Sequence, residues 1–148
     1  MPENYGLPTS TSFVPAPDLS ATDLAEALDT FHQALHAWHN IALPVAVKSI
    51  CAALGVDYRG ELEVLTGEAG ESSNIVILRG VSVAAAEVAQ ALRADPRFEE
   101  DPRTDMLSVA MYLSDGASPI DLPLVKRIPK DGYKTPHWVP VFVKLAGT

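Results

Sequence analysis

The chain has 148 residues and a net charge of −8, with 47% apolar and 20% charged residues. This length suits one domain, and this composition excludes an intrinsically disordered chain. No apolar run approaches the length of a membrane-spanning helix, so we expect no membrane insertion. Cys51 is the single cysteine, which excludes an internal disulfide, and the N-terminus shows no signal-peptide pattern. We therefore expect a cytoplasmic protein.

The charge is unevenly distributed along the chain. Residues 1–121 contain 6 Lys or Arg against 18 Asp or Glu, a net charge of −12. Residues 122–148 contain 5 Lys or Arg against 1 Asp, a net charge of +4. A chain this acidic lacks the generally basic surface that would neutralise nucleic-acid phosphates, so nucleic acid is an unfavoured partner.

The N-terminal segment is predicted to be an extended or flexible arm. Residues 1–17 contain four prolines and no hydrophobic periodicity, and a helix interior does not tolerate proline. Phe13 is an apolar side chain with which this arm could dock on another surface. We expect a single α+β domain at residues 18–148 to follow.

Two helices are predicted at the start of this domain. Ser20 is a good N-cap, and an apolar seam at helical spacing follows it to about Asn40. A second apolar helix begins near Pro44 and ends at Gly55, a residue type common after helices. The seam of the first helix, which we expect to meet a partner, consists of Leu28, Phe31, Leu35 and Trp38.

The rest of the chain predicts a sheet and one further helix. Residues 61–66 and 75–78 are predicted strands joined by an acidic loop at 67–73, and Ser82 is predicted to cap a helix to Ala94. Alternating apolar residues over 107–113 predict another strand, and 122–128 and 139–145 predict a hairpin. The expected fold is α+β: two N-terminal helices, then a mixed or antiparallel sheet of about four to five strands with one further helix.

Three histidines of the first predicted helix form a candidate metal site. His32, His36 and His39 stand at positions i, i+4 and i+7, and an i, i+4 pair can bind one divalent transition metal. A further ligand would have to come from elsewhere in the chain, such as His137. The alternatives are that the histidines lie at the rim of a helix interface, or that they make such an interface sensitive to pH.

The C-terminal segment is a second candidate site. It interleaves cations with aromatic side chains, a mixture that can hold a phosphate backbone and stack on a base. Because the rest of the chain is acidic, we favour electrostatic complementarity with its own domain or with a second copy. The residues are Lys126, Arg127, Lys130, Tyr133, Lys134 and Trp138.

These features favour a non-catalytic function. No nucleophile motif or phosphate-binding loop is found, and the acidic stretch at 99–101 is typical of a solvated surface. We expect an assembly, adaptor or chaperone-like subunit that acts through protein–protein contacts, including a structural subunit of a larger particle. The expected partner is another protein or a second copy in a homo-oligomer. The alternative is a small metal-dependent enzyme or ligand-binding domain that uses the histidine face.

Overall fold

The structure, a computed structural model, describes residues 19–66, 74–126 and 132–147. The predicted arm at 1–17 and the predicted acidic loop at 67–73 lie outside these ranges. In chain order the elements are α1 (Ala21–Trp38), β1 (Asn40–Ala42), α2 (Leu43–Leu54), β2 (Arg59–Thr66), β3 (Ile75–Val81), α3 (Val83–Ala94), β4 (Phe98–Pro102), α4 (Met106–Ser114), β5 (His137–Trp138) and β6 (Val141–Leu145).

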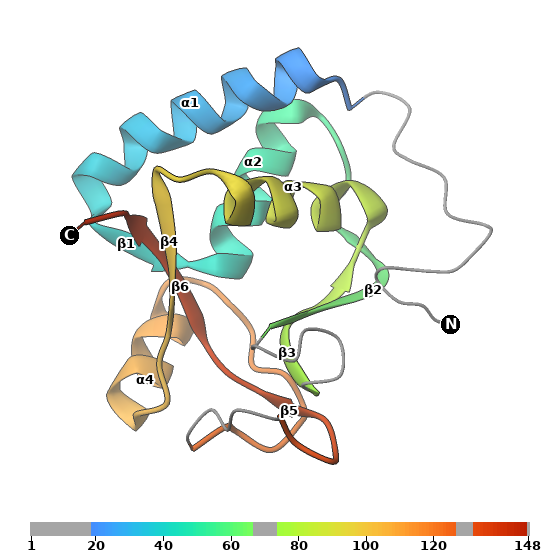
Figure 1. The fold of residues 1–148 in the computed structure, drawn as a ribbon, viewed down its shortest axis with the longest axis vertical. Coiled ribbons are helices and arrows are strands. Elements are labelled where there is room, and N and C mark those ends of the chain that lie inside the picture. The colour runs from blue at the N-terminus through green and yellow to red at the C-terminus, as the bar shows by residue number, and fades with distance from the viewer. Residues whose placement is uncertain (1–18, 67–73, 127–131, 148) are drawn as a thin grey trace.

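The strands form two small sheets (Figure 1). In the first sheet the order is β1-β6-β4, and both neighbours of β6 run antiparallel to it. In the second sheet the order is β2-β3-β5, with β2 antiparallel to β3 and β5 parallel to β3. The α+β class is therefore confirmed, but the strands are divided between two sheets where the sequence predicts one.

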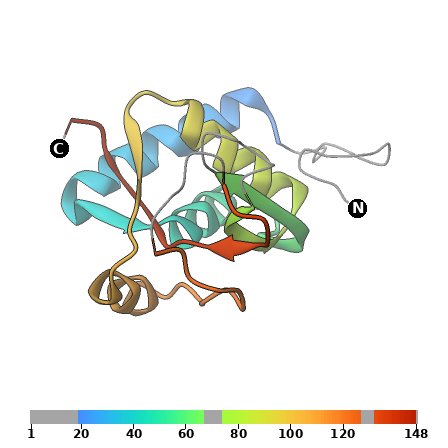
Figure 2. The same cartoon turned by 60° about the horizontal axis from the view of Figure 1, so that its bottom comes forward.

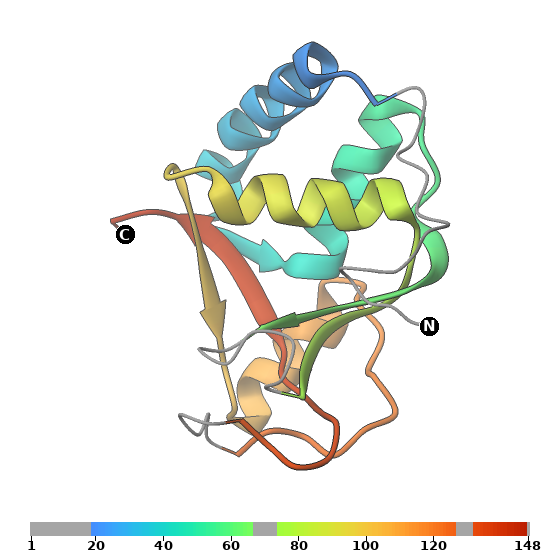
Figure 3. The same cartoon turned by 45° about the vertical axis from the view of Figure 1, so that its right-hand side comes forward.

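The helices lie on two sides of the molecule. Figure 2 shows α1 and α3 on one side and α4 on the other. Figure 3 shows α3 between α1 and the hairpin of β2 and β3, and α3 packs against both α2 and β2. A large core of buried apolar side chains holds α1, α2 and α3 on the strands, and α4 covers a separate small cluster: Ala42, Tyr112, Ala117, Trp138 and Phe142.

Local sequence signals explain the first three helices. The Ser20 hydroxyl accepts a hydrogen bond from the Asp23 N–H, and the Ser82 hydroxyl does the same for the Ala85 N–H. Gly55 ends α2 with a φ of 72°, a left-handed conformation that glycine adopts without steric cost. The predictions of these helices and of the β2–β3 hairpin are confirmed.

The second half of the chain differs from the sequence prediction in three places, and two of the predictions there, the strand at 107–113 and the C-terminal hairpin, are wrong. Residues 106–114 form the helix α4 and not a strand, so the domain contains a helix more than predicted. The acidic residues at 99–101 remain exposed or half-exposed, as expected, but belong to a strand that the sequence did not predict, β4, which pairs with β6. The predicted C-terminal hairpin is absent from the described residues, because Leu124 and Trp138 meet in a parallel bridge. The predicted turn at 130–132 lies partly outside those residues.

A β-bulge near the start of β2 changes the direction of the first residues of that strand. Arg59 and Leu62 both pair with Val81, so the register shifts between them. At Gly60 a Cβ atom would stand 2.6 Å from the Ser82 Cα, a distance that no real side chain tolerates. The close approach therefore requires glycine, and bulges of this kind commonly redirect a neighbouring side chain.

Candidate functional site

Helix α4 presents the clearest exposed apolar surface among the described residues. The exposed fractions are 72% for Met106, 73% for Leu107, 39% for Met111 and 43% for Leu113. Only Ser108 and Tyr112, one helical turn apart, are buried. No residue from 106 to 114 is charged. We call the surface formed by Met106, Leu107, Met111 and Leu113 the α4 face.

The cap of α4 explains why this segment is helical. Asp105 accepts hydrogen bonds from the Ser108 N–H at 2.9 Å and from the Ser108 hydroxyl at 2.8 Å. These bonds, that of the hydroxyl first, lower the pKa of the Asp105 carboxyl. The Asp-x-x-Ser pattern at 105–108 is the signal that could have indicated a helix start. The alternation of apolar residues after it instead suggested a strand.

The apolar seam of α1 is mostly part of the protein's own core. Leu28, Phe31 and Leu35 are buried against the large cluster, so they leave little surface for a partner. Trp38, the last residue of α1, is 54% exposed. Of the predicted seam, Trp38 alone has the exposure that an interface residue needs. Phe13, the predicted anchor of the arm, lies outside the described residues.

The structure brings two of the three candidate histidines together. The rings of His32 and His36 meet edge to face with centroids 4.9 Å apart, and the His32 ring also contacts Phe98 at 5.7 Å. His39 follows the end of α1 with a φ of 69°. Within the described ranges, no three His, Cys, Asp or Glu side chains form a group that could hold a metal ion.

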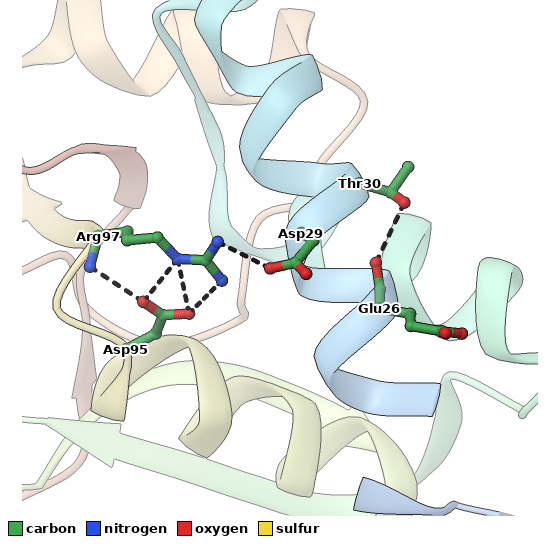
Figure 4. A network of polar contacts seen from close by, with 5 residues as sticks. All are labelled: Glu26, Asp29, Thr30, Asp95 and Arg97. Atoms are coloured by element: carbon green, nitrogen blue, oxygen red, sulfur yellow. Dashed lines mark hydrogen bonds and ion pairs between the residues drawn. The ribbon is translucent and has the colours of Figure 1, made fainter. Parts of the chain in front are cut away.

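Asp29, the carboxylate nearest in sequence to these histidines, forms an ion pair with Arg97. Figure 4 shows Arg97 between Asp95 and Asp29, with an N–O distance of 2.8 Å to each carboxylate. The hydrogen bonds from Arg97 lower the pKa of Asp95. The contact ties α1 to the turn between α3 and β4. Asp29 is therefore occupied by a structural ion pair on the histidine side of α1.

The C-terminal candidate residues separate into different environments. Trp138 is buried in the small cluster, where its ring lies 5.7 Å from that of Tyr112. Tyr133 stacks on His137 with ring centroids 3.8 Å apart. Lys126 and Lys134 are exposed, while Arg127 and Lys130 lie outside the described residues. Trp138 thus belongs to the core, although the sequence suggested a partner contact.

The fold and this surface define an α+β protein with an exposed apolar helix. Comparison with protein-family models, curated proteins and solved structures found no match to this chain. None of the described helices has the length and apolar character needed to cross a membrane.

Proposed function

We propose that this protein is a non-catalytic assembly subunit that binds a second copy of itself through the α4 face. The single observation that supports the proposal most is the exposure of Met106 and Leu107 on a helix without charged residues. Contiguous apolar surfaces on folded proteins commonly mark interaction sites. Burying this surface in an interface would remove it from water, which stabilises a complex by roughly 25 cal/mol per Å².

A second copy satisfies the chemistry of this surface. The α4 face has no charge that would select an acidic or a basic partner, and methionine adapts its shape to an opposing apolar surface. In a twofold dimer the same face meets itself, and antiparallel α4 helices place the positive end of each helix dipole beside the negative end of the other. Each copy thereby supplies the apolar partner that the other requires.

Sedimentation equilibrium on the full chain tests this proposal. We expect the wild type to dimerise and the Met106→Gln/Leu107→Gln double variant to be monomeric at the same concentration. Both side chains are exposed, so their replacement should leave the far-UV circular dichroism spectrum unchanged. Trp38→Gln is the matched comparison, because it makes an equally polar change at an exposed apolar residue of another helix.

Two outcomes would overturn the α4 interface. If Trp38→Gln dissociates the dimer and the α4 variant does not, the interface lies at the end of α1. If the wild type is monomeric over the whole concentration range, a second copy is not the partner of the α4 face.

The alternative function suggested by the sequence would use the histidine face of α1. Its support is the contact between His32 and His36, which is the i, i+4 arrangement that a transition metal can bridge. Elemental analysis of untagged protein tests it. Under this alternative, bound metal would be present in the wild type and lost in His32→Gln/His36→Gln, whereas equal content in both proteins would exclude these ligands.

A further inference from the structure

A cavity of about 300 Å³ lies between three parts of the molecule. Its walls come from the start of α2, from the β2–β3 hairpin and from the segment that follows α4. This volume is at the lower end of the range of small-molecule sites. The cavity uses neither the α4 face nor the histidines, so the proposed assembly function does not account for it.

The charged side chains around this cavity are mainly positive, whereas the chain as a whole is negatively charged. Residues 1–121 contain only 6 Lys or Arg against 18 Asp or Glu, yet three of these six cations line this one cavity. Asp121 supplies the only carboxylate among its described lining residues. The three cations are Lys48, Arg59 and Arg79.

Two of these cations have no acidic partner among the described residues. Arg79 pairs with Glu63 at 2.7 Å, whereas no described carboxylate forms an ion pair with Lys48 or Arg59. The remaining arginines of this part of the chain are all in ion pairs: Arg93, Arg97 and Arg103. Two cations at one cavity of an acidic protein, neither of them paired with a described carboxylate, indicate a site for an anion.

The first turn of α2 also borders the cavity. Pro44 and Val45 line it, and Lys48 stands one turn further along the same helix. The N-cap residue Ala42 provides no side-chain acceptor for the first turn of α2, and its own N–H donates a hydrogen bond to the Asp115 carboxylate at 3.0 Å. The Asp115 carboxylate already offsets part of the attraction of this helix N-terminus for anions, so Lys48 and Arg59 supply the positive charge that an anion in the cavity would meet.

Apolar side chains make up much of the remaining lining, together with the hydroxyl-bearing residues Tyr58 and Ser118. Ile77, Leu78 and Ala117 are buried lining residues, whereas Lys48 and Arg59 are exposed at the surface. Tyr112 also contributes to the lining and is fully buried, and its hydroxyl oxygen is shielded from solvent and has no hydrogen-bond partner among the described residues. The cavity thus combines cationic side chains at the surface with a partly apolar lining.

We propose that this cavity binds a small organic phosphate, with the phosphate group held by Lys48 and Arg59 and the apolar part of the ligand against the apolar lining. The planar guanidinium of Arg59 can donate two parallel hydrogen bonds to phosphate oxygens. Lys48 neutralises a further charge of the dianion. The apolar lining selects a ligand with a carbon skeleton over inorganic phosphate.

Titration of the ¹⁵N-labelled full chain, followed by NMR, tests the site with phenyl phosphate as the probe. We expect saturable shifts of the amide signals of Val45, Lys48 and Arg59. Phenyl phosphate should bind more tightly than inorganic phosphate, because its ring buries apolar surface. Benzoate and chloride at equal ionic strength should produce weaker, non-saturating shifts.

A pair of matched variants locates the binding. Lys48→Gln/Arg59→Gln should weaken phenyl phosphate about tenfold or more, the loss expected for charge-assisted hydrogen bonds. Lys126→Gln/Lys134→Gln removes the same charge from exposed residues that do not line the cavity, and should retain wild-type affinity. Neither pair touches the α4 face, so the sedimentation result and this result are independent.

Three results would overturn the proposal. Equal weakening by both double variants would mean that phosphate responds only to overall charge. Affinity for phenyl phosphate no higher than for inorganic phosphate would show that the apolar lining takes no ligand. Saturable binding of benzoate without binding of phenyl phosphate would assign the cavity to carboxylates.

Discussion

The two tryptophans of this chain occupy opposite environments. Trp138 is buried beside Tyr112 and Phe142, whereas Trp38 is more than half exposed at the end of α1. Trp138→Ala should therefore lower the free energy of unfolding by about 3–5 kcal/mol, because it opens a cavity in the small cluster. Trp38→Ala should change it by about 0.5 kcal/mol or less. Urea unfolding of each variant at a concentration that excludes dimers measures both values.

A larger loss of unfolding free energy for Trp38→Ala than for Trp138→Ala would contradict the assignment of Trp138 to the core and Trp38 to the surface. A small effect at Trp138 would mean that the cluster under α4 contributes little to stability. A large effect at Trp38 in the monomer would mean that its ring packs on the protein's own surface.

Buried ionisable groups predict a loss of stability at alkaline pH. Burial raises the pKa of Cys51 from 9.0 to about 11, and burial followed by the nearby Cys51 raises that of Tyr58 from 10.0 to about 12. The unfolded chain therefore releases these protons first as the pH rises. The stabilisation is fully present below about pH 9 and is lost as the pH approaches about 12.

Urea unfolding between about pH 8 and about pH 11 measures this slope. We expect a fall on the order of 1–2 kcal/mol, after allowance for the partial exposure of Tyr58. The Cys51→Ala/Tyr58→Phe double variant should show a smaller slope, even if its stability at neutral pH is lower. An unchanged slope would assign the alkaline loss to other groups.

At the scale of elements, the bulge in β2 depends on the absence of a side chain at one position. Gly60→Ala would place a Cβ atom 2.6 Å from the Ser82 Cα and 2.7 Å from the Val81 carbonyl oxygen. Backbone atoms cannot move aside as a side-chain end can, so we expect a loss of about 1–3 kcal/mol in unfolding free energy. The backbone movement that relieves this clash should also displace Arg59 and weaken the binding of phenyl phosphate.

Gly55→Ala provides the control for this substitution. No atom lies within 4 Å of a Cβ built at Gly55, so that change costs only the strain of a left-handed residue, about 1 kcal/mol. Phenyl phosphate affinity should remain that of the wild type. If Gly55→Ala weakened the ligand as much as Gly60→Ala, the effect would reflect general destabilisation and not the position of Arg59.

Helix α4 shows why short apolar elements are difficult to assign from sequence. In a segment of nine residues, Leu107, Val109, Met111 and Leu113 satisfy the alternation of a strand. In the structure Ser108 and Tyr112 face inward, so the buried positions are those between the alternating apolar residues. Hydrophobic periodicity fails here because three of the four alternating apolar side chains, Leu107, Met111 and Leu113, are exposed.

At the scale of the whole molecule, the net charge of −8 predicts how self-association responds to salt. Two like-charged copies repel each other, and salt screens this repulsion without weakening apolar contacts. Raising NaCl from about 0.05 M to about 0.5 M should therefore tighten dimerisation through the α4 face by about threefold or more. Sedimentation equilibrium at the two salt concentrations measures the change.

Weaker dimerisation at high salt would contradict an interface at the α4 face. It would instead indicate attraction between opposite charges, as between the exposed Lys126 and Lys134 and an acidic surface of a second copy. The Lys126→Gln/Lys134→Gln variant separates the two cases, because it should weaken only an association of the second kind.

Much of the first half of the fold could be predicted from local signals. Ser20, Ser82 and Gly55 mark helix ends because their effects depend on backbone groups within a few residues. The same reasoning could not predict the different exposure of Leu35 and Trp38, which belong to one apolar seam. Leu35 is fully buried, whereas Trp38 is more than half exposed. The burial of each depends on which elements cover α1, and those elements come from distant parts of the chain.

The sequence by itself determined the acidic composition, the α+β class and the first three helices, because these follow from side-chain chemistry and short-range hydrogen bonds. Only the tertiary structure decided which side chains remain in contact with solvent. It buried Trp138, exposed the α4 face and brought Lys48, Arg59 and Arg79 to one cavity from separate elements. Such surfaces depend on contacts between residues far apart in the chain, and the spacing of residues along the sequence does not show which of them will meet.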